Sequence, residues 1–192
     1  MAGFNETINQ VFGLLDREVW IVTSAFAGDR GGLLATWVSQ ASIDPDDPLV
    51  VIALAVNHHT KDLVDRGGAF GLHLIAREQI DLAWRFALGS GRDRDKLAGV
   101  DQSPQMTGAP ILADCLAWLD CQVIDRHEAA DRKLFWGRVL GGGVQRGGTP
   151  LRERELLASA SAEQSQALKR DLQSDIELQR PLITAWKANR TA

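Results

Sequence analysis

The sequence predicts a mainly β fold of antiparallel strands, with helices added in the middle and at the C-terminal end. Three apolar, β-prone runs follow one another within about forty residues and have no helix between them, which favours antiparallel pairing over β-α-β units. Two later runs predict a hairpin, and the composition after residue 150 is typical of helices. We therefore expect a β domain at residues 1–150 and a C-terminal helical extension at 151–192.

Length and charge limit the classes of partner. The chain of 192 residues carries 21 Lys and Arg against 25 Asp and Glu, a net charge of -4. This balance gives no general attraction to nucleic acid or to an anionic membrane, so a small molecule or a protein is the expected partner. No apolar run reaches the roughly 18 residues of a membrane-spanning helix, and residues 1–16 lack the pattern of a secretion signal. We expect a cytoplasmic protein.

The N-terminal part predicts a short helix and then three strands. Residues 5–15 have the apolar spacing of an amphipathic helix. Segment 27–32 (AGDRGG) predicts a turn, and the prolines and aspartates at 44–48 interrupt regular structure. The runs rich in β-branched and aromatic residues that predict the strands are 19–26, 33–43 and 49–56.

The middle of the chain predicts one more strand between two helices. Residues 61–68 indicate a short helix that ends at glycines, with Thr60 as a possible N-cap. A strand at 70–75 and an amphipathic helix at 78–88 follow. Residues 89–109 are polar and interrupted by glycines, and a long loop of this kind inside a compact domain is more often functional than idle.

The last strand candidates, 115–125 and 134–144, predict a long hairpin joined by charged residues. Cys115 and Cys121 flank an apolar stretch at a spacing that suits neither zinc nor a redox pair, so we expect buried free thiols.

Beyond a glycine-rich boundary at 141–150, Leu168, Leu172 and Ile176 recur every four residues and predict a helix whose apolar stripe needs burial. Pro181 should start a second helix or kink the first.

Several motifs stand in an order that can be recognised. They are Thr23-Ser24, Gly31-Gly32, ATWVSQASIDP at 35–45 with Pro48, NHHT at 57–60, LAWRFA at 82–87, RDKLAGV at 94–100, GAPILADCLAWLDC at 108–121 and LFWGRV at 134–139. In this order they resemble the flavin reductase-like family, the FMN-binding split barrels, over about residues 17–145. The sequence at 34–42 is most similar to that of the flavin reductase-like domain of flavodiiron proteins. The resemblance implies a six-stranded antiparallel Greek-key split β-barrel that forms a homodimer with FMN in the cleft between subunits.

One segment is the expected binding site of the flavin ring. Such a ring needs an apolar slot with backbone donors and acceptors along its polar edge, and small side chains let the backbone come close. Without the resemblance the segment reads as an ordinary half-buried strand; with it, we expect flavin contact. The candidate residues are Ala35, Thr36, Trp37, Val38, Ser39, Gln40, Ala41 and Ser42. FAD is possible in place of FMN, because the same groups would serve either ring.

A second segment, at a predicted helix start, is the expected phosphate site because it offers hydroxyls, backbone N–H groups and cationic charge. The candidates are Asn57, His58, His59, Thr60 and Lys61, and the resemblance adds Lys96 from the polar loop. Arg92 and Arg94 in that loop are either phosphate ligands or solvated. Neighbouring histidines on an extended chain point to opposite sides and no third ligand is near in sequence, so no metal is expected.

Trp37 is either a stacking partner for flavin or nicotinamide, or a core or dimer-interface residue. The other aromatic residues on apolar patterns are predicted to lie in the core: Trp84, Phe86, Trp118 and Trp136.

The family pattern is broken at one position. Many members have Gly-Asp-His before the last strand, with the His near the nicotinamide, whereas this chain has Ala130-Asp131-Arg132. Arg132 keeps a cationic donor on the nicotinamide side, but it cannot titrate near neutral pH as His does.

The resemblance implies an NAD(P)H-dependent flavin oxidoreductase that uses NADH or NADPH and passes electrons to a monooxygenase or another acceptor. The alternatives are an FMN-binding electron-transfer or flavin-carrier protein without pyridine-nucleotide reductase activity, and a dimeric scaffold built from the C-terminal helices.

Overall fold

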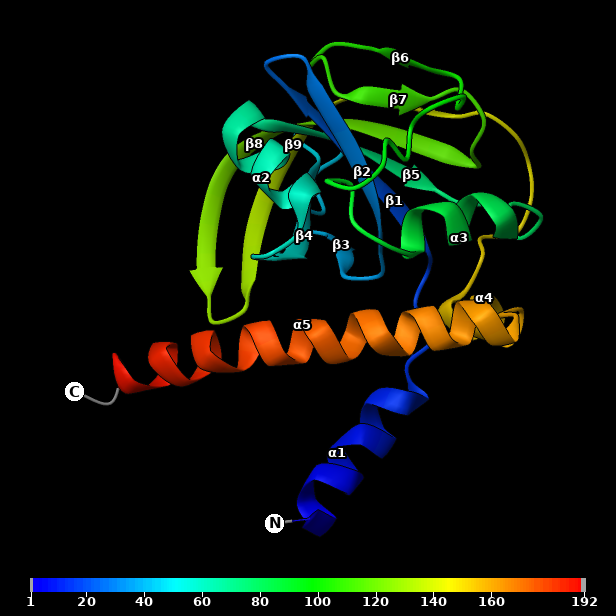
Figure 1. The fold of residues 1–192 in the computed structure, drawn as a ribbon. Helices are drawn as coiled ribbons and strands as arrows, with labels where there is room; N and C mark the ends of the chain where they lie inside the picture. The colour runs from blue at the N-terminus through cyan, green and yellow to red at the C-terminus, as the bar shows by residue number, and fades with distance from the viewer. Residues whose placement is uncertain (1, 191–192) are drawn as a thin grey trace.

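A computed structural model describes residues 2–190, and its main element is a curled, seven-stranded antiparallel sheet in the order β2-β1-β5-β8-β9-β4-β3 (Figure 1). Its strands are β1 (Trp20–Phe26), β2 (Asp29–Ala35), β3 (Val38–Gln40), β4 (Leu49–Ala55), β5 (Ala69–Leu74), β8 (Ala117–Ala129) and β9 (Arg132–Val144). A small second sheet pairs β6 (Gln102–Pro104) with β7 (Pro110–Leu112). The prediction of a mainly β, antiparallel fold with added helices is confirmed.

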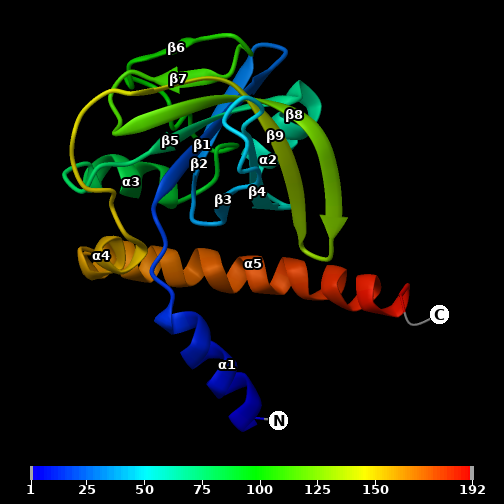
Figure 2. The same ribbon diagram turned by 180° about the vertical axis from the view of Figure 1, so that it is seen from behind.

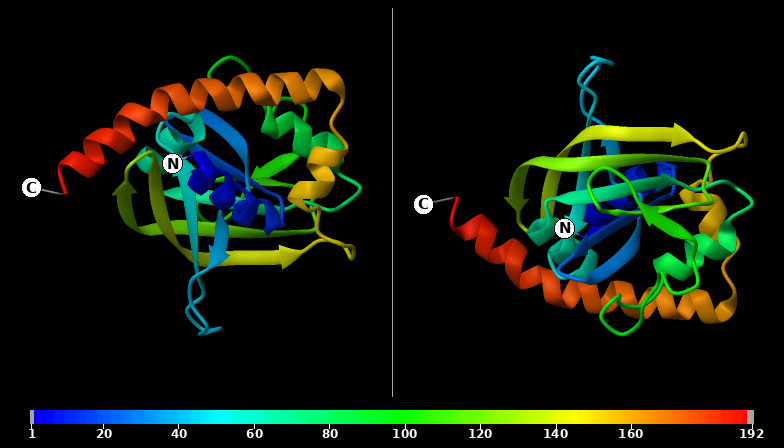
Figure 3. Two further views of the ribbon diagram at one scale, coloured as in Figure 1. Left: turned by 90° about the horizontal axis from the view of Figure 1, so that it is seen from below. Right: turned by 90° about the horizontal axis from the view of Figure 1, so that it is seen from above.

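The predicted strand 33–43 is divided in two, which is why the sheet has seven strands. β2 and β3 lie at opposite edges of the sheet and are joined only by Thr36 and Trp37, where the chain turns a corner between the two edges. The loop that follows β3 extends away from the barrel (Figure 3). The sheet therefore curls into a barrel that is split at this corner.

The turn predicted at 27–32 is shorter than expected. Only Ala27 and Gly28 form it, with φ angles of 51° and 87°, and the following residues extend β2. Gly31 and Gly32 serve close packing instead: a Cβ on Gly32 would lie 2.6 Å from the ring of Phe86. Glycine favours turns through its backbone freedom, but at these two positions the fold depends on the absence of a side chain.

Two clusters of buried side chains fill the two sides of the sheet. Ile21 and Val22 are neighbours on β1 and point to opposite faces, so each belongs to a different cluster. One cluster fills the barrel around Phe70 and Phe135, and the other joins the sheet to α3 (Ile80–Ala87) and α4 (Glu153–Ala158).

Of the aromatic residues predicted to be core, Trp84 and Phe86 are buried and Trp118 packs partly against their cluster. Trp136 is only half-buried, because its neighbour Phe135 takes the inward position. Cys115 and Cys121 are buried free thiols, as predicted.

The N-terminal helix α1 (Ala2–Leu14) stands away from the barrel, whereas α2 (His59–Gly67) packs on it (Figures 1 and 2). The N-cap of α2 is His58, so the prediction of Thr60 as N-cap is wrong: Thr60 lies inside the helix and is buried. Gly68 ends the helix at φ 68°, which agrees with the predicted glycine stop.

The C-terminal helix α5 (Ala162–Ala188) is a single helix of 27 residues that starts with a capping box at Ser161. It continues through Pro181, so no second helix begins there. Figure 3 shows α5 running along one side of the barrel to the end of the β8–β9 hairpin. No helix within residues 2–190 combines the length and apolarity that crossing a lipid bilayer requires.

His73 on β5 connects the barrel to the small sheet. It is fully buried, its Nδ1 lies 3.0 Å from the carbonyl oxygen of Ile21, and its Nε2 accepts a hydrogen bond from the N–H of Leu112. Both contacts suit one neutral tautomer, and burial lowers the pKa of His73 from its usual 6.5 to about 4.

Acid should therefore destabilise the fold through His73. Between pH 6.5 and 4 the unfolded chain binds a proton that the folded chain does not, so stability falls as the pH falls, by up to about 3 kcal/mol. Urea unfolding at pH 7 and pH 4.5 measures the loss, and an NMR titration of His73 measures its pKa directly. His127→Gln, at an exposed histidine, is the control. A normal titration of His73 near 6.5 would contradict this account.

Candidate functional site

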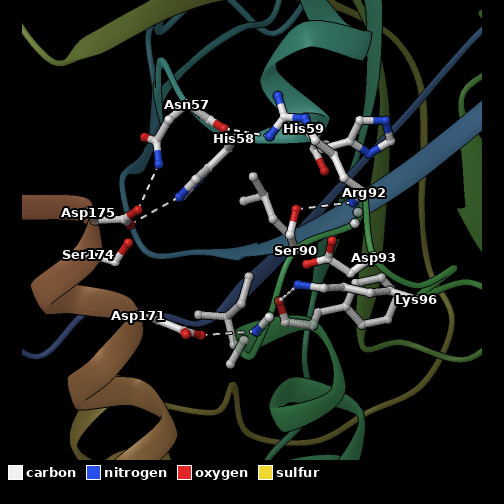
Figure 4. A pocket seen from close by; sticks show the side chains of 18 of the residues that line it. Asn57, His58, His59, Ser90, Arg92, Asp93, Lys96, Asp171, Ser174 and Asp175 are labelled. Carbon is white, nitrogen blue, oxygen red and sulfur yellow. Dashed lines mark hydrogen bonds and ion pairs between the residues drawn. The ribbon is translucent and has the colours of Figure 1, made fainter. Parts of the chain in front are cut away.

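Two cavities lie beside the segments predicted to bind flavin. The larger, about 610 Å³, is the loop cavity, formed by β2, the start of α2, the loop after α3 and α5 (Figure 4). The smaller, about 440 Å³, is the corner cavity, formed around the turn between β2 and β3. The lining of the loop cavity includes Asn57, His58, His59, Thr60, Gly89, Arg92, Lys96, Asp171 and Asp175. The lining of the corner cavity includes Thr36, Trp37, Val38, Ser39, Val51, Ile52 and Leu134.

The predicted ring-binding segment is only partly gathered at one cavity. Residues 36–39 line the corner cavity, but the side chain of Ala35 packs inside the barrel. Gln40 and Ser42 bond locally: the amide of Gln40 donates to the carbonyl of Ser42, and the hydroxyl of Ser42 donates to that of Asp47. Ala41 also lies outside both cavity linings, and its N–H pairs with the carbonyl of Leu49. Flavin contact by these residues stays a prediction.

The predicted phosphate segment is brought together at the loop cavity. Residues 57–60 line it, together with Lys96 from the loop after α3. Lys61 does not line it, because its ammonium group pairs with Asp62 at 2.8 Å. His59 pairs with Asp29 at 3.0 Å, so it is held at the wall.

Lys96 is the buried cation of the loop cavity. Its ammonium group donates to the carbonyl of Phe86 at 2.9 Å. Burial and, to a smaller extent, the charge of Arg94 lower its pKa to about 8, while the charge of Asp171 on α5 acts in the opposite direction. The other cation, Arg92, already donates to the carbonyl of Asn57 and to Asp62.

Two arginines clamp the loop that carries Lys96. The guanidinium of Arg85 donates to the carbonyls of Lys96, at 2.7 Å, and of Ala98. The guanidinium of Arg94 donates to the carbonyls of Arg85, at 2.8 Å, and of Leu88, at 3.0 Å. Arg94 is thus neither a cavity residue nor simply solvated; it fixes the loop.

Helix α5 supplies site residues that the sequence reading missed. Asp175 accepts a hydrogen bond from the amide of Asn57 at 2.7 Å and lies 3.3 Å from Nε2 of His58 (Figure 4). Gln179, one turn further, donates to the side-chain oxygen of Asn57 at 3.0 Å. Gln179 is the buried residue of α5. A buried polar residue on an otherwise exposed helix indicates that these hydrogen bonds hold α5 against the site.

Arg132 connects the two cavities. Its guanidinium lies over the ring of Trp37, 4.9 Å from the ring centroid, and donates to Asp131 at 2.7 Å and to Gln179 at 2.8 Å. Through Gln179 it reaches Asn57 in the loop cavity. Trp37 remains 48% exposed, so it is not a core residue. The predicted contact of Arg132 with nicotinamide stays a prediction.

Within residues 2–190 no group of three or more His, Cys, Asp or Glu is arranged to hold a metal ion.

The pKa of His58 should respond to Asp175. Burial holds this pKa below its usual range, while the charge and hydrogen bond of Asp175 raise it. Asp175→Asn removes the charge and should lower the pKa of His58 further, as measured by NMR titration. Glu177→Gln, an exposed carboxylate on the same helix, should leave it unchanged. An unchanged pKa of His58 in Asp175→Asn would show that the two side chains do not interact.

Comparison with known proteins identifies the family. Residues 12–155 match the model of the flavin reductase like domain. The chain is 29% identical over 149 residues to diflavin flavoprotein A 1 of Synechocystis, which covers 75% of this chain and 25% of that protein. It thus spans about a quarter of the length of that relative. It is 31% identical over 129 residues to HsaB, the reductase subunit of a flavin-dependent monooxygenase of Rhodococcus jostii, covering 67% of this chain and 64% of that one.

Among solved structures, component B of nitrilotriacetate monooxygenase from Mycobacterium thermoresistibile is similar, with a TM-score of 0.69 and 30% identity over 79% of this chain and 83% of that one. The family match ends at residue 155, so α5 lies beyond it. The resemblance inferred from the motifs is confirmed, and the chain belongs to the flavin reductase-like domain family.

Proposed function

We propose that this protein is an NAD(P)H-dependent flavin oxidoreductase that binds FMN, or FAD, in a cleft of a homodimer. Family membership supports an oxidoreductase. The observation that carries the proposal is that the motif segments 36–39 and 57–60 line two cavities, which Arg132 and Gln179 connect.

The corner cavity suits a flavin ring. Val38, Ile52 and Leu134 give it apolar walls, and Thr36 and Ser39 contribute hydroxyl groups. β3 pairs only with β4 in the described sheet, so the backbone groups on its other edge are available to the polar edge of a ring. Its volume of about 440 Å³ is within the range of small-molecule sites.

The loop cavity suits the polar chain that a flavin carries. It offers the amide of Asn57, the imidazole of His58 and the ammonium of Lys96 on walls that are otherwise partly apolar. Asp171 and Asp175 face the same space, which is a partial mismatch for a phosphate. The fit is therefore good for a hydroxyl-bearing chain and weaker for its terminal anion.

A bound flavin supplies the redox chemistry, because it accepts hydride at N5 from C4 of a nicotinamide. The residues of this chain need to orient two rings, donate hydrogen bonds and exclude water. This chemistry requires no strong acid or base. In agreement with this, most of the ionisable groups that line the two cavities are already paired with another group. Arg132, at the end of the β8–β9 hairpin, is the cation that we propose contacts the pyridine nucleotide.

The corner offers the surface for a homodimer. Trp37 and Ile43 are 48% and 99% exposed beside the open edge of the sheet. A second copy packed there would cover both side chains and close the cavity. The similarity to the reductase subunit of a flavin-dependent monooxygenase makes a monooxygenase the first electron acceptor to test.

The second candidate is an FMN-binding electron carrier without pyridine-nucleotide reductase activity. The contacts of Arg132 favour it, since its guanidinium already bonds Asp131 and Gln179 and stacks on Trp37. Those contacts occupy donors that a nucleotide phosphate would need.

The visible spectrum of the purified protein tests both. We expect flavin to bind and its visible absorbance to bleach on anaerobic addition of NADH or NADPH. Bound flavin that stays oxidised supports the carrier. A protein that takes up no flavin contradicts both functions.

Arg132→Ala separates the nucleotide side from the flavin side. We expect KM for the nucleotide to rise about tenfold, the effect of about 1.4 kcal/mol of lost binding, while flavin affinity changes less than about threefold. Arg138→Ala, on the same strand with an exposed pairing to Asp47, is the matched control. Equal losses of nucleotide and flavin binding would contradict a nucleotide role for Arg132.

A further inference from the structure

Helix α5 lies beyond the family match, yet it forms one wall of the loop cavity. Figure 4 shows Asp171 and Asp175 pointing from this helix toward the opposite wall. They are four residues apart, so they lie on the same face one turn from each other. A feature outside the common domain therefore contributes two carboxylates to the predicted flavin site.

These carboxylates already use the donors that an incoming anion would need. Asp175 binds the amide of Asn57 and contacts His58, at 2.7 and 3.3 Å. Asp171 accepts a hydrogen bond from the backbone N–H of Gly89 at 3.1 Å, and its charge acts on Lys96. Three donors are thus engaged by carboxylate, and the buried Lys96 is engaged by the carbonyl of Phe86.

The docking of α5 is fixed by specific contacts. Gln179 is buried and bonds both Asn57 and Arg132, so it holds the helix one turn beyond Asp175. Arg92 pairs with Asp62 and the imidazole of His59 contacts Asp29, so both side chains of the wall already have carboxylate partners. A phosphate in this cavity would meet two carboxylates at close range and few free donors.

We propose that Asp171 and Asp175 are specificity-determining residues that remove the preference for a phosphorylated flavin. The cavity then accepts the neutral hydroxyl end of riboflavin about as well as the phosphate of FMN. This proposal rests on the proposed flavin-binding function, and it names the substrate class of the same site: flavins irrespective of their phosphate. The two carboxylates place the protein's own negative charge at the position where the family motif predicts a phosphate.

The test compares flavin affinities in three full-length proteins: the wild type, the double variant Asp171→Asn/Asp175→Asn, and Glu177→Gln. Asparagine keeps the shape and an acceptor oxygen, so α5 can stay docked while the charge is lost. Glu177 lies on the same helix, is exposed, and bonds only Gln173 among the contacts described, so its substitution removes one carboxylate from α5 without facing the cavity. Fluorescence titrations give Kd for FMN and for riboflavin.

We expect the wild type and Glu177→Gln to bind the two flavins within about threefold of each other. The double variant should prefer FMN by about tenfold or more, because the repulsion is gone and the donors are shared with a neutral amide. An unchanged ratio in the double variant, or a wild type that already prefers FMN by tenfold, overturns the proposal.

Inorganic phosphate provides a readout that is independent of flavin. In ³¹P and His58 NMR titrations, phosphate should bind the double variant more tightly than the wild type by about the same factor. If no protein binds flavin but the double variant gains phosphate affinity, the proposed function fails and the role of the carboxylates stands. If flavin binds and neither the flavin ratio nor phosphate affinity changes, the carboxylate role fails and the proposed function stands.

Discussion

The corner at Thr36 and Trp37 is the constraint on which the site depends. A seven-stranded sheet that curls must either pair its edges or leave a seam, and here the two edge strands follow one another in the chain. The seam is therefore held by a covalent link of two residues. The β2 side of the corner borders the loop cavity and the β3 side borders the corner cavity, so one short segment organises both.

A chain of polar side chains then ties distant parts of the sequence to that corner. Arg132 stacks on Trp37, Gln179 joins Arg132 to Asn57, and Asp175 receives a hydrogen bond from Asn57. Such a network is stable only when its members are satisfied together, because each buried polar group left unpaired costs about 1–3 kcal/mol. The barrel, the hairpin end and α5 are thus coupled by hydrogen bonds.

Much of the fold followed from the sequence, because strands with strong β-branched runs, such as 19–26 and 49–56, match β1 and β4 closely. The predictions were wrong where one sequence pattern has two possible physical explanations. Gly31 and Gly32 indicated a turn but serve close packing, against Leu63 and Phe86 respectively. The charged residues 126–133 indicated a connection but mostly extend the hairpin, to Ala129 on β8 and from Arg132 on β9. The motif residues 57–60 and Lys96 line one cavity, and their contact with a phosphate stays a prediction. Asp175 and Gln179 could not be predicted as site residues, because α5 lies outside the motifs. The sequence alone does not show which face of this helix packs against the barrel.

The arginine clamp on the loop after α3 has a consequence for how ligands are received. Arg85 of α3 donates to main-chain carbonyls of that loop, and Arg94 of the loop donates to main-chain carbonyls at the end of α3. A loop that is already ordered loses little conformational entropy when a ligand binds in the cavity. Ordering of the loop therefore offsets little of the binding free energy. The cavity therefore needs little change of conformation to bind a ligand. Its surface charges, rather than a change of shape, then determine which ligands it discriminates.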